Sequence, residues 1–153
     1  MTTLPTTWRD YTAKLTAAQV EKLTRMEHGS DPRACELQAR AYAMHNALQT
    51  ELAGVPLPHG AMSADEWVGD DGPQPFRTWA GSSWIVPAHS DDSLDWRVSH
   101  DDLKVEIQGV QLADGRTKRY VTVEGLPSDG LLPLASVRLL SESLAEAIAE
   151  PLI

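Results

Sequence analysis

Residues 103–124, LKVEIQGVQLADGRTKRYVTVE, carry the sequence signals that decide the fold. Apolar residues alternate with polar ones from Leu103 to Ile107, which is the period of a strand with one buried face. Asp114-Gly115 is typical of a two-residue type I′ turn, because both central positions of that turn need a positive φ. The stretch therefore predicts a β-hairpin.

The pairing of the two predicted strands needs one further feature, because the alternation changes phase after Gly109. A tight turn continued without a break leaves Ile107 opposite a threonine. One extra residue in the first strand instead sets Ile107 opposite Val121 and pairs the valine two positions earlier with Val123. We therefore expect a β-bulge at residues 108–109.

Residues 7–53 are expected to form a helical hairpin. Thr16 and Gln19 match a capping box at the start of a short helix, and Asp31-Pro32 supplies an N-cap and a first-turn proline for a longer one. The apolar face of the short helix consists of Leu15, Val20, Leu23 and Met26. The long helix carries a continuous stripe at three- and four-residue spacing, made of Ala34, Leu37, Ala41, Met44, Leu48 and Leu52.

A proline-rich connection, residues 54–63, cannot continue a helix and is expected to run extended. Aromatic and β-branched runs at residues 66–68, 76–80 and 83–86 predict further strands. Together with the hairpin they form a mainly antiparallel sheet over residues 64–125. The tryptophans of these runs are expected to pack in the core: Trp67, Trp79 and Trp84.

Residues 132–150 predict a C-terminal helix, because apolar residues recur there at helical spacing. They are Leu134, Val137, Leu140, Leu144 and Ile148. A helix that follows an antiparallel meander normally folds back onto one face of that sheet. The prediction is a single α+β domain over residues 1–153, with an N-terminal helical pair, a mainly antiparallel β-sheet and a C-terminal helix packed on the sheet.

Composition narrows the classes of function. The 153 residues include 13 lysines and arginines against 22 aspartates and glutamates, a formal charge of −9, which makes nucleic acid an unlikely partner. The single cysteine, Cys35, excludes an internal disulfide and a multi-cysteine zinc site. The N-terminus lacks the pattern of a signal peptide, and no apolar run is long enough to span a membrane. We therefore expect a cytoplasmic protein that does not bind membranes.

The hairpin and the C-terminal helix together resemble the C-terminal half of small actinobacterial and mycobacteriophage proteins of unknown function, which combine an ADGR hairpin with an alanine- and leucine-rich last helix. The opening WRDYTAKLTAAQVEKL is similar to the start of such proteins. The matching hairpin residues are Ala113, Asp114, Gly115, Arg116, Arg119, Val121 and Val123, and the matching helix residues are Leu132, Val137, Arg138, Leu140, Leu144 and Ala147. The resemblance implies no activity, but it is compatible with a phage or prophage accessory gene.

A histidine- and aspartate-rich segment before the hairpin is the one constellation that could bind a metal. Imidazole and carboxylate groups can hold a divalent ion, and the candidate ligands are His89, Asp91, Asp92, Asp95 and His100. Their spacing matches neither a calcium loop nor an HExxH helix. The other interpretation is a solvated acidic loop, and no cofactor is expected.

The sequence gives less support to hydrolysis, phosphate binding or nucleic-acid binding. Gly81-Ser82-Ser83-Trp84 lacks the GxSxG pattern of a hydrolase nucleophile, and residues 69–72 form a turn motif rather than a phosphate cradle. The positive charges near the hairpin tip suit strand solubility better than a nucleic-acid contact, because acidic residues flank them. These charges are Arg116, Lys118 and Arg119.

The sequence thus favours a non-enzymatic protein that acts through protein contacts. The stripe on the long helix has near-heptad spacing and could seat a second copy in a homodimer. The acidic surface could dock a basic protein partner instead. The alternative function is a divalent-metal-binding domain built around residues 89–102.

Overall fold

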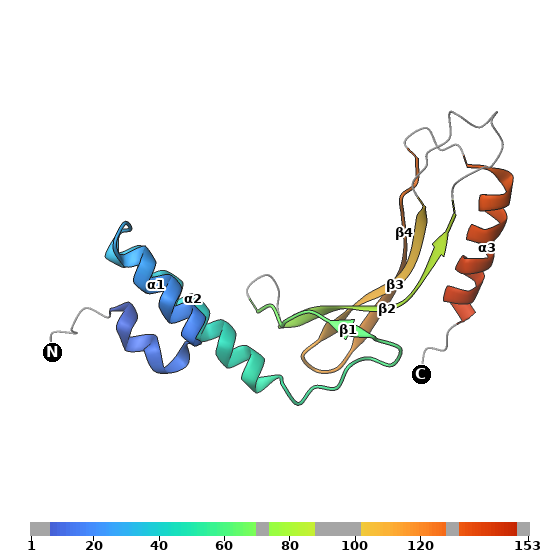
Figure 1. Cartoon of the computed structure of the whole chain (residues 1–153). Helices are drawn as coiled ribbons and strands as arrows, with labels where there is room; N and C mark the ends of the chain where they lie inside the picture. The colour runs from blue at the N-terminus through green and yellow to red at the C-terminus, as the bar shows by residue number, and fades with distance from the viewer. Residues whose placement is uncertain (1–6, 70–73, 88–101, 128–131, 150–153) are drawn as a thin grey trace. The chain divides into compact units, whose positions relative to one another are not determined.

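A computed structural model of the protein describes residues 7–69, 74–87, 102–127 and 132–149 (Figure 1). The elements make an α+β fold, in which a C-terminal helix packs on an antiparallel sheet. The chain divides into two compact units, the helical unit (Met1–Val55 with Trp67–Pro75) and the sheet unit (Pro56–Glu66 with Phe76–Ile153). A single domain over residues 1–153 stays a prediction. Within the described ranges, no helix is long and apolar enough to cross a lipid bilayer.

The helical unit consists of a 3-10 helix, η1 (Trp8–Lys14), and two α-helices, α1 (Ala17–Glu27) and α2 (Pro32–Glu51). Both predicted α-helix starts are confirmed. The backbone N–H of Gln19 donates to Thr16 Oγ1 at 3.3 Å, and its side chain accepts from the Thr16 N–H at 2.9 Å. Asp31 Oδ1 accepts from the backbone N–H of Arg33 at 3.0 Å. After the short connection at residues 28–31, α2 runs back beside α1 (Figure 1).

The core of the helical unit contains Trp8, Leu23, Cys35 and Ala39, with Tyr11, Leu15, Val20, Met26 and Tyr42 packed around them. The predicted apolar face of α1 is therefore confirmed. Helix α2 contributes small side chains to this core. They leave room for the large indole of Trp8 and for the fully buried Leu23, which pack against them.

The apolar stripe predicted on α2 is not the face of the helix that the helical unit buries. Leu37 and Met44 are 56% and 58% exposed, whereas Cys35, Ala39 and Ala43 are buried. Apolar periodicity could not choose between the two faces, because an alanine-rich helix carries apolar side chains on both. We call the residues of the stripe that lie within the helix the outer face of α2: Ala34, Leu37, Ala41, Met44 and Leu48.

The sheet unit contains β1 (Ser63–Ala64), β2 (Phe76–Val86), β3 (Leu103–Leu112), β4 (Thr117–Glu124) and the helix α3 (Leu134–Ala149). In the described residues the strands form one antiparallel sheet in the order β1-β2-β3-β4. The strand predicted at residues 66–68 is replaced by the earlier two-residue β1. The two runs predicted as separate strands at residues 76–80 and 83–86 are one strand.

The hairpin of β3 and β4 has the predicted pairs, Ile107 with Val121 and Val105 with Val123. The predicted bulge at residues 108–109 is wrong, because the register is unbroken from Lys104 to Gln111. The extra residue lies in the turn, where the backbone N–H of Gly115 donates to the Leu112 carbonyl at 2.9 Å.

The turn itself also differs from the predicted type I′. Among the described residues only glycines have a positive φ, and Gly115, at +88°, is one of them whereas Asp114 is not. Leu112 and Arg116 close a three-residue loop through the bond from the Leu112 N–H to the Arg116 carbonyl, 2.8 Å. A turn followed by a left-handed glycine is the usual geometry of such a loop, and it corrects the strand register without a bulge.

The register irregularity occurs in β2 instead. The pairing with β3 shifts between Ala80 and Ser83, so β2 has one residue more than β3 in this interval. A Cβ on Gly81 would lie 2.9 Å from the carbonyl oxygen of Gly60, which explains why a glycine stands at the shift.

One face of the sheet packs against α3. The core there consists of Trp79, Val86, Leu103, Val105, Ile107 and Ala147, with Trp84, Leu140 and Leu144 packed against it. Burial of Trp67 and Trp79 confirms two of the three tryptophan predictions in full, and Trp84 is partly buried.

Of the predicted apolar face of α3, only Leu140 and Leu144 pack on the core. Leu134, Val137 and Ile148 are exposed, whereas Ser136 and Ala147 are buried. Small residues lie where α3 closely approaches the strands and their ends. There Ser136 Oγ donates to the Pro87 carbonyl at 2.7 Å. At the other end of α3, Arg119 Nη2 donates to the Ala147 carbonyl at 3.2 Å, a favourable position for a cation at a helix C-terminus.

Two side chains hold the proline-rich connection on the sheet. Gln111 is 2% exposed, and its Nε2 donates to the Pro56 carbonyl at 2.9 Å. Arg77 Nη2 donates to the same carbonyl at 3.1 Å, and Arg77 Nε donates to Gln111 Oε1 at 2.9 Å. The connection is therefore anchored at Pro56 by a polar network that centres on the buried Gln111.

We predict that Gly109→Ala destabilises the sheet unit by about 3 kcal/mol, because a Cβ there overlaps the Trp79 indole and the Lys118 carbonyl, neither of which can move freely. Urea unfolding followed by circular dichroism measures the loss. Gly29→Ala is the matched control, since a Cβ at Gly29 meets nothing within 4 Å. Equal stability of the two variants would contradict the packing described.

Candidate functional site

The predicted metal ligands His89, Asp91, Asp92, Asp95 and His100 lie outside the described residues. Among the residues that are described, no group of three or more His, Cys, Asp or Glu side chains is placed to hold a metal ion. The metal site therefore stays a prediction.

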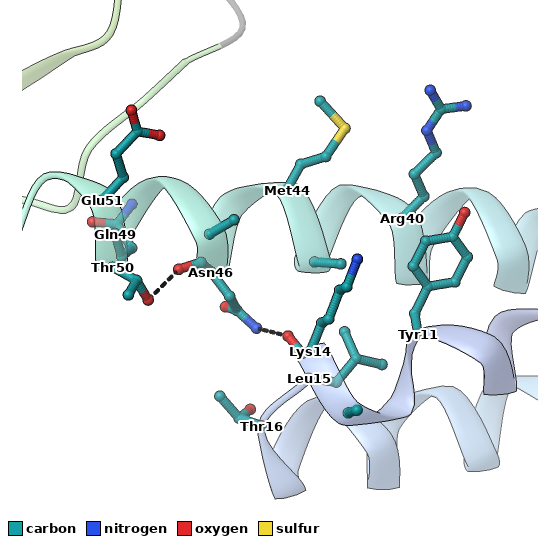
Figure 2. Close-up of a pocket in the computed structure, with 13 residues that line it drawn as sticks. Tyr11, Lys14, Leu15, Thr16, Arg40, Met44, Asn46, Gln49, Thr50 and Glu51 are labelled. Atoms are coloured by element: carbon teal, nitrogen blue, oxygen red, sulfur yellow. Dashed lines mark hydrogen bonds between the residues drawn. The ribbon is translucent and has the colours of Figure 1, made fainter.

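A hollow with a volume of about 1040 Å³ lies in the helical unit, between η1 and α2 (Figure 2). Its apolar lining comes from Ala13, Leu15, Ala43, Met44 and Ala47. Its polar lining consists of Tyr11, Lys14, Thr16, Arg40, Asn46, Gln49, Thr50 and Glu51. This mixture of an apolar wall with scattered polar groups is typical of a binding surface.

Asn46 organises the hollow. Its Nδ2 donates to the Lys14 carbonyl and to Gln19 Oε1, both at 2.8 Å, and its Oδ1 accepts from Gln19 Nε2 at 3.2 Å. One side chain of α2 thus binds the end of η1 and the start of α1, where the chain turns. The hollow opens beside this junction, because η1 ends there while α2 continues to Glu51.

Charge is unevenly distributed around the hollow. Figure 2 shows Arg40 and Tyr11 at one end, Glu51 at the other and Asn46 between them. Lys14 and Arg40 place two cations at the lining of a chain with a formal charge of −9. The lining contains no histidine, cysteine or serine.

A second hollow of about 470 Å³ lies on the other side of α2. It is lined by Leu37, Arg40, Ala41, Met44, His45, Leu48, Gly69 and Pro75. Arg40 and Met44 line both hollows and therefore form a ridge between them. The outer face of α2 thus presents a projecting apolar side chain with a depression on either side.

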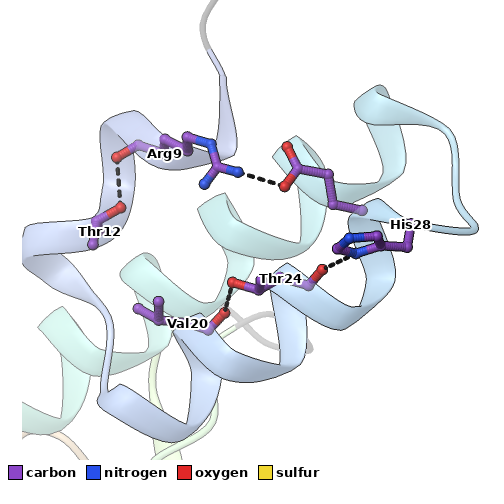
Figure 3. A network of polar contacts seen from close by, with 6 residues as sticks. Arg9, Thr12, Val20, Thr24 and His28 are labelled. Carbon is purple, nitrogen blue, oxygen red and sulfur yellow. Dashed lines mark hydrogen bonds and ion pairs between the residues drawn. The ribbon is translucent and has the colours of Figure 1, made fainter.

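A polar network at the far end of η1 is structural (Figure 3). Arg9 Nη2 pairs with Glu27 Oε2 at 2.6 Å, and its guanidinium lies 4.5 Å from the centre of the Trp8 ring. His28 Nδ1 lies 2.9 Å from the Thr24 carbonyl oxygen at the end of α1. These contacts are largely exposed, so each contributes about 1 kcal/mol or less. The pair of Arg9 and Glu27 joins η1 to α1.

The sheet face opposite α3 carries polar side chains. Glu106 accepts from Lys104 Nζ at 2.8 Å and from Gln108 Nε2 at 2.5 Å. The hydrogen bond from Lys104, and then that from Gln108, lower the pKa of Glu106 below its ordinary value. Such a row of mutually bonded polar residues is typical of a solvated sheet face.

The basic residues of the hairpin make contacts within the sheet unit. Arg116 Nε pairs with Asp114 Oδ2 at 2.8 Å, and its backbone N–H also lowers the pKa of Asp114. Arg119 bonds α3, and Lys118 Nζ lies 5.4 Å from the centre of the Tyr120 ring. These partners favour the structural interpretation of the charges at the tip.

Sequence reasoning missed the hollow beside Asn46. The capping box marked the turn before α1, but the contact from Lys14 to Asn46 spans 32 residues and has no local signature. The repeat of small residues at Cys35, Ala39 and Ala43 was the signal available for the buried face of α2.

No family model matches the chain, and no curated protein or solved structure shows significant similarity to it. The resemblance to actinobacterial and phage proteins stays a prediction.

We predict that Asn46→Ala lowers the unfolding free energy of the helical unit by about 1–2 kcal/mol, because the Lys14 carbonyl and Gln19 lose their hydrogen-bond partner. Urea unfolding followed by far-ultraviolet circular dichroism measures the change. Thr50→Ala is the control, since it removes only an exposed bond to the Asn46 carbonyl within the same helix. An unchanged midpoint in Asn46→Ala would show that the junction does not depend on this side chain.

We predict that the stability difference between the wild type and Glu106→Gln depends on pH. A carboxylate whose pKa is lowered by folding stabilises the protein above its unfolded pKa, about 4.3, and that contribution is lost as the pH falls through the folded value. The wild type should be the more stable protein at pH 7, and the difference should disappear near pH 3. Unfolding midpoints at pH 7, 5 and 3 test this, with Glu146→Gln as the control for loss of one charge. A difference that grows on acidification would refute the assignment.

Proposed function

We propose that this chain is a non-enzymatic cytoplasmic interaction protein that docks a helix of a protein partner on the outer face of α2. The observation that supports the proposal is the exposure of Leu37 and Met44, each more than half accessible, on a helix whose opposite face is buried. Large apolar side chains grouped on one exposed face are typical of protein-binding surfaces.

The shape of this face supports a helical ligand. The ridge of Arg40 and Met44 lies between two hollows, and a helix laid along α2 can place its own side chains in both. The apolar side chains provide contact area, whereas Arg40 on the ridge and Lys14 and Glu51 at the margins provide orientation.

The acidic surface offers a second mode of docking. The formal charge of −9 favours association with basic proteins through long-range attraction, which salt weakens. Docking on the outer face of α2 depends on buried apolar area and should resist salt. The resemblance to actinobacterial and phage proteins favours an accessory role in such a host.

Affinity capture from an actinobacterial lysate tests the docking face. We expect Met44→Glu to reduce the capture of specific partners by about tenfold, because a charge in the centre of an apolar interface is costly. Ile85→Glu is the matched control, since Ile85 is 62% exposed in the sheet unit and lies outside the proposed surface.

The salt dependence separates the two modes. Partners held by the outer face of α2 should remain bound in about 0.5 M sodium chloride, whereas partners held by the acidic surface should be released. Capture that is insensitive to Met44→Glu and lost in salt would reject the helical docking face in favour of the acidic surface.

A further inference from the structure

The outer face of α2 has the spacing of a helix that pairs with another helix. Ala34, Leu37, Ala41, Met44 and Leu48 follow one another at intervals of three, four, three and four residues, the a and d positions of two heptads. Among the described residues of the helical unit, these side chains pack on no other helix, because η1 and α1 pack on the face of α2 that buries Cys35 and Ala39. Leu48, at the end of the face, is half-buried and lies close to Gly69.

The shape of this surface also resembles that of a helix in a packed pair, with a projecting side chain and hollows beside it. Met44 projects from the ridge, with hollows of about 1040 and 470 Å³ on its two sides. In packed helix pairs each projecting side chain enters a depression formed by residues of the facing helix. The outer face of α2 supplies the projection, whereas η1 on one side and Gly69 with Pro75 on the other help to line the depressions beside it.

The residues complement themselves when two copies of α2 run antiparallel. In the register that centres the pair on residues 42–43, Met44 of one copy faces Ala41 of the other, and Leu37 faces Leu48. A large side chain then meets a small one at the centre, which is the arrangement that fills space between two helices.

Charge selects the same orientation. The antiparallel register brings Arg33 of one copy beside Glu51 of the other, twice by symmetry. A parallel pair would instead place Glu51 against Glu51, so like charges would face one another.

We propose that a second copy of this chain occupies the outer face of α2, forming a symmetric dimer through antiparallel α2 helices. The proposal rests on the proposed function of that face as a docking surface and names its occupant. Two heptads bury less area than a standard interface, so the dissociation constant should be on the order of 10 µM.

Sedimentation equilibrium of the full chain tests the association. We expect a reversible monomer–dimer equilibrium that Met44→Glu shifts to monomer and Ile85→Glu leaves unchanged. Arg33→Glu and Glu51→Arg should each weaken the dimer by about fivefold, and the double variant should restore it, because the two charges are exchanged across the interface. Weakening without restoration would overturn the antiparallel register.

Disulfide formation tests the orientation directly. Residues 37 and 48 lie about 16 Å apart along one helix, too far for a bond within a chain. The double variant Leu37→Cys/Leu48→Cys should therefore oxidise to a covalent dimer, while each single variant should not. Covalent dimers from the single variants would indicate parallel helices and overturn the proposal. Native Cys35 is buried and should not contribute.

The two proposals fail differently. A monomer at every concentration, combined with Met44-dependent capture of another protein, overturns the second copy as occupant and leaves the docking face standing. A monomer without such capture overturns both.

Discussion

The helical unit depends on the packing of Trp8 and Leu23 against α2. A bulky indole and a fully buried leucine leave little room for side chains on the facing helix, so the residues that point toward them are small. Cys35, Ala39 and Ala43 meet this requirement at intervals of four residues. Because one helix cannot bury two faces against the same neighbours, the larger Leu37 and Met44 are turned outward. The candidate binding face is thus a consequence of how the core is filled.

Elements fixed by local chemistry could be predicted from the sequence. The capping residues Thr16 and Asp31 act on backbone groups two or three residues away, so their hydrogen bonds need no knowledge of the rest of the chain. The pairs of Val105 with Val123 and Ile107 with Val121 followed from the need to gather apolar side chains on one face. The α+β architecture followed from the order of these elements.

Features that depend on the size of a distant neighbour could not be predicted in this way. The turn at Gly115 and the shift at Gly81 both correct the strand register, and the sequence offers glycines at both places and at Gly109 as well. Gly109 serves a different purpose, because the Trp79 indole lies where its side chain would be. The face that α3 buries is likewise set by close approach at Ser136 and Ala147 together with Leu140 and Leu144, and not by Leu134 or Ile148.

The candidate site shows the same division. Its wall residues were recognised as an apolar stripe, but their exposure could be known only after the core of the helical unit was known. The hollow beside Asn46 exists because a side chain of α2 bonds a carbonyl 32 residues earlier, a contact that no sequence pattern marks. The metal hypothesis concerns residues that the structure does not describe, so geometry neither supports nor opposes it.

The burial of Cys35 makes its thiol a natural reporter of local opening. The side chain is fully inaccessible, enclosed where α2 meets η1 and α1. A thiol reagent can reach the sulfur only when α2 separates from its neighbours, so the labelling rate measures the free energy of that separation. Since the thiol lies on the opposite side of α2 from Leu37 and Met44, a ligand on the outer face would slow labelling only by stabilising the helix, and never by covering the sulfur.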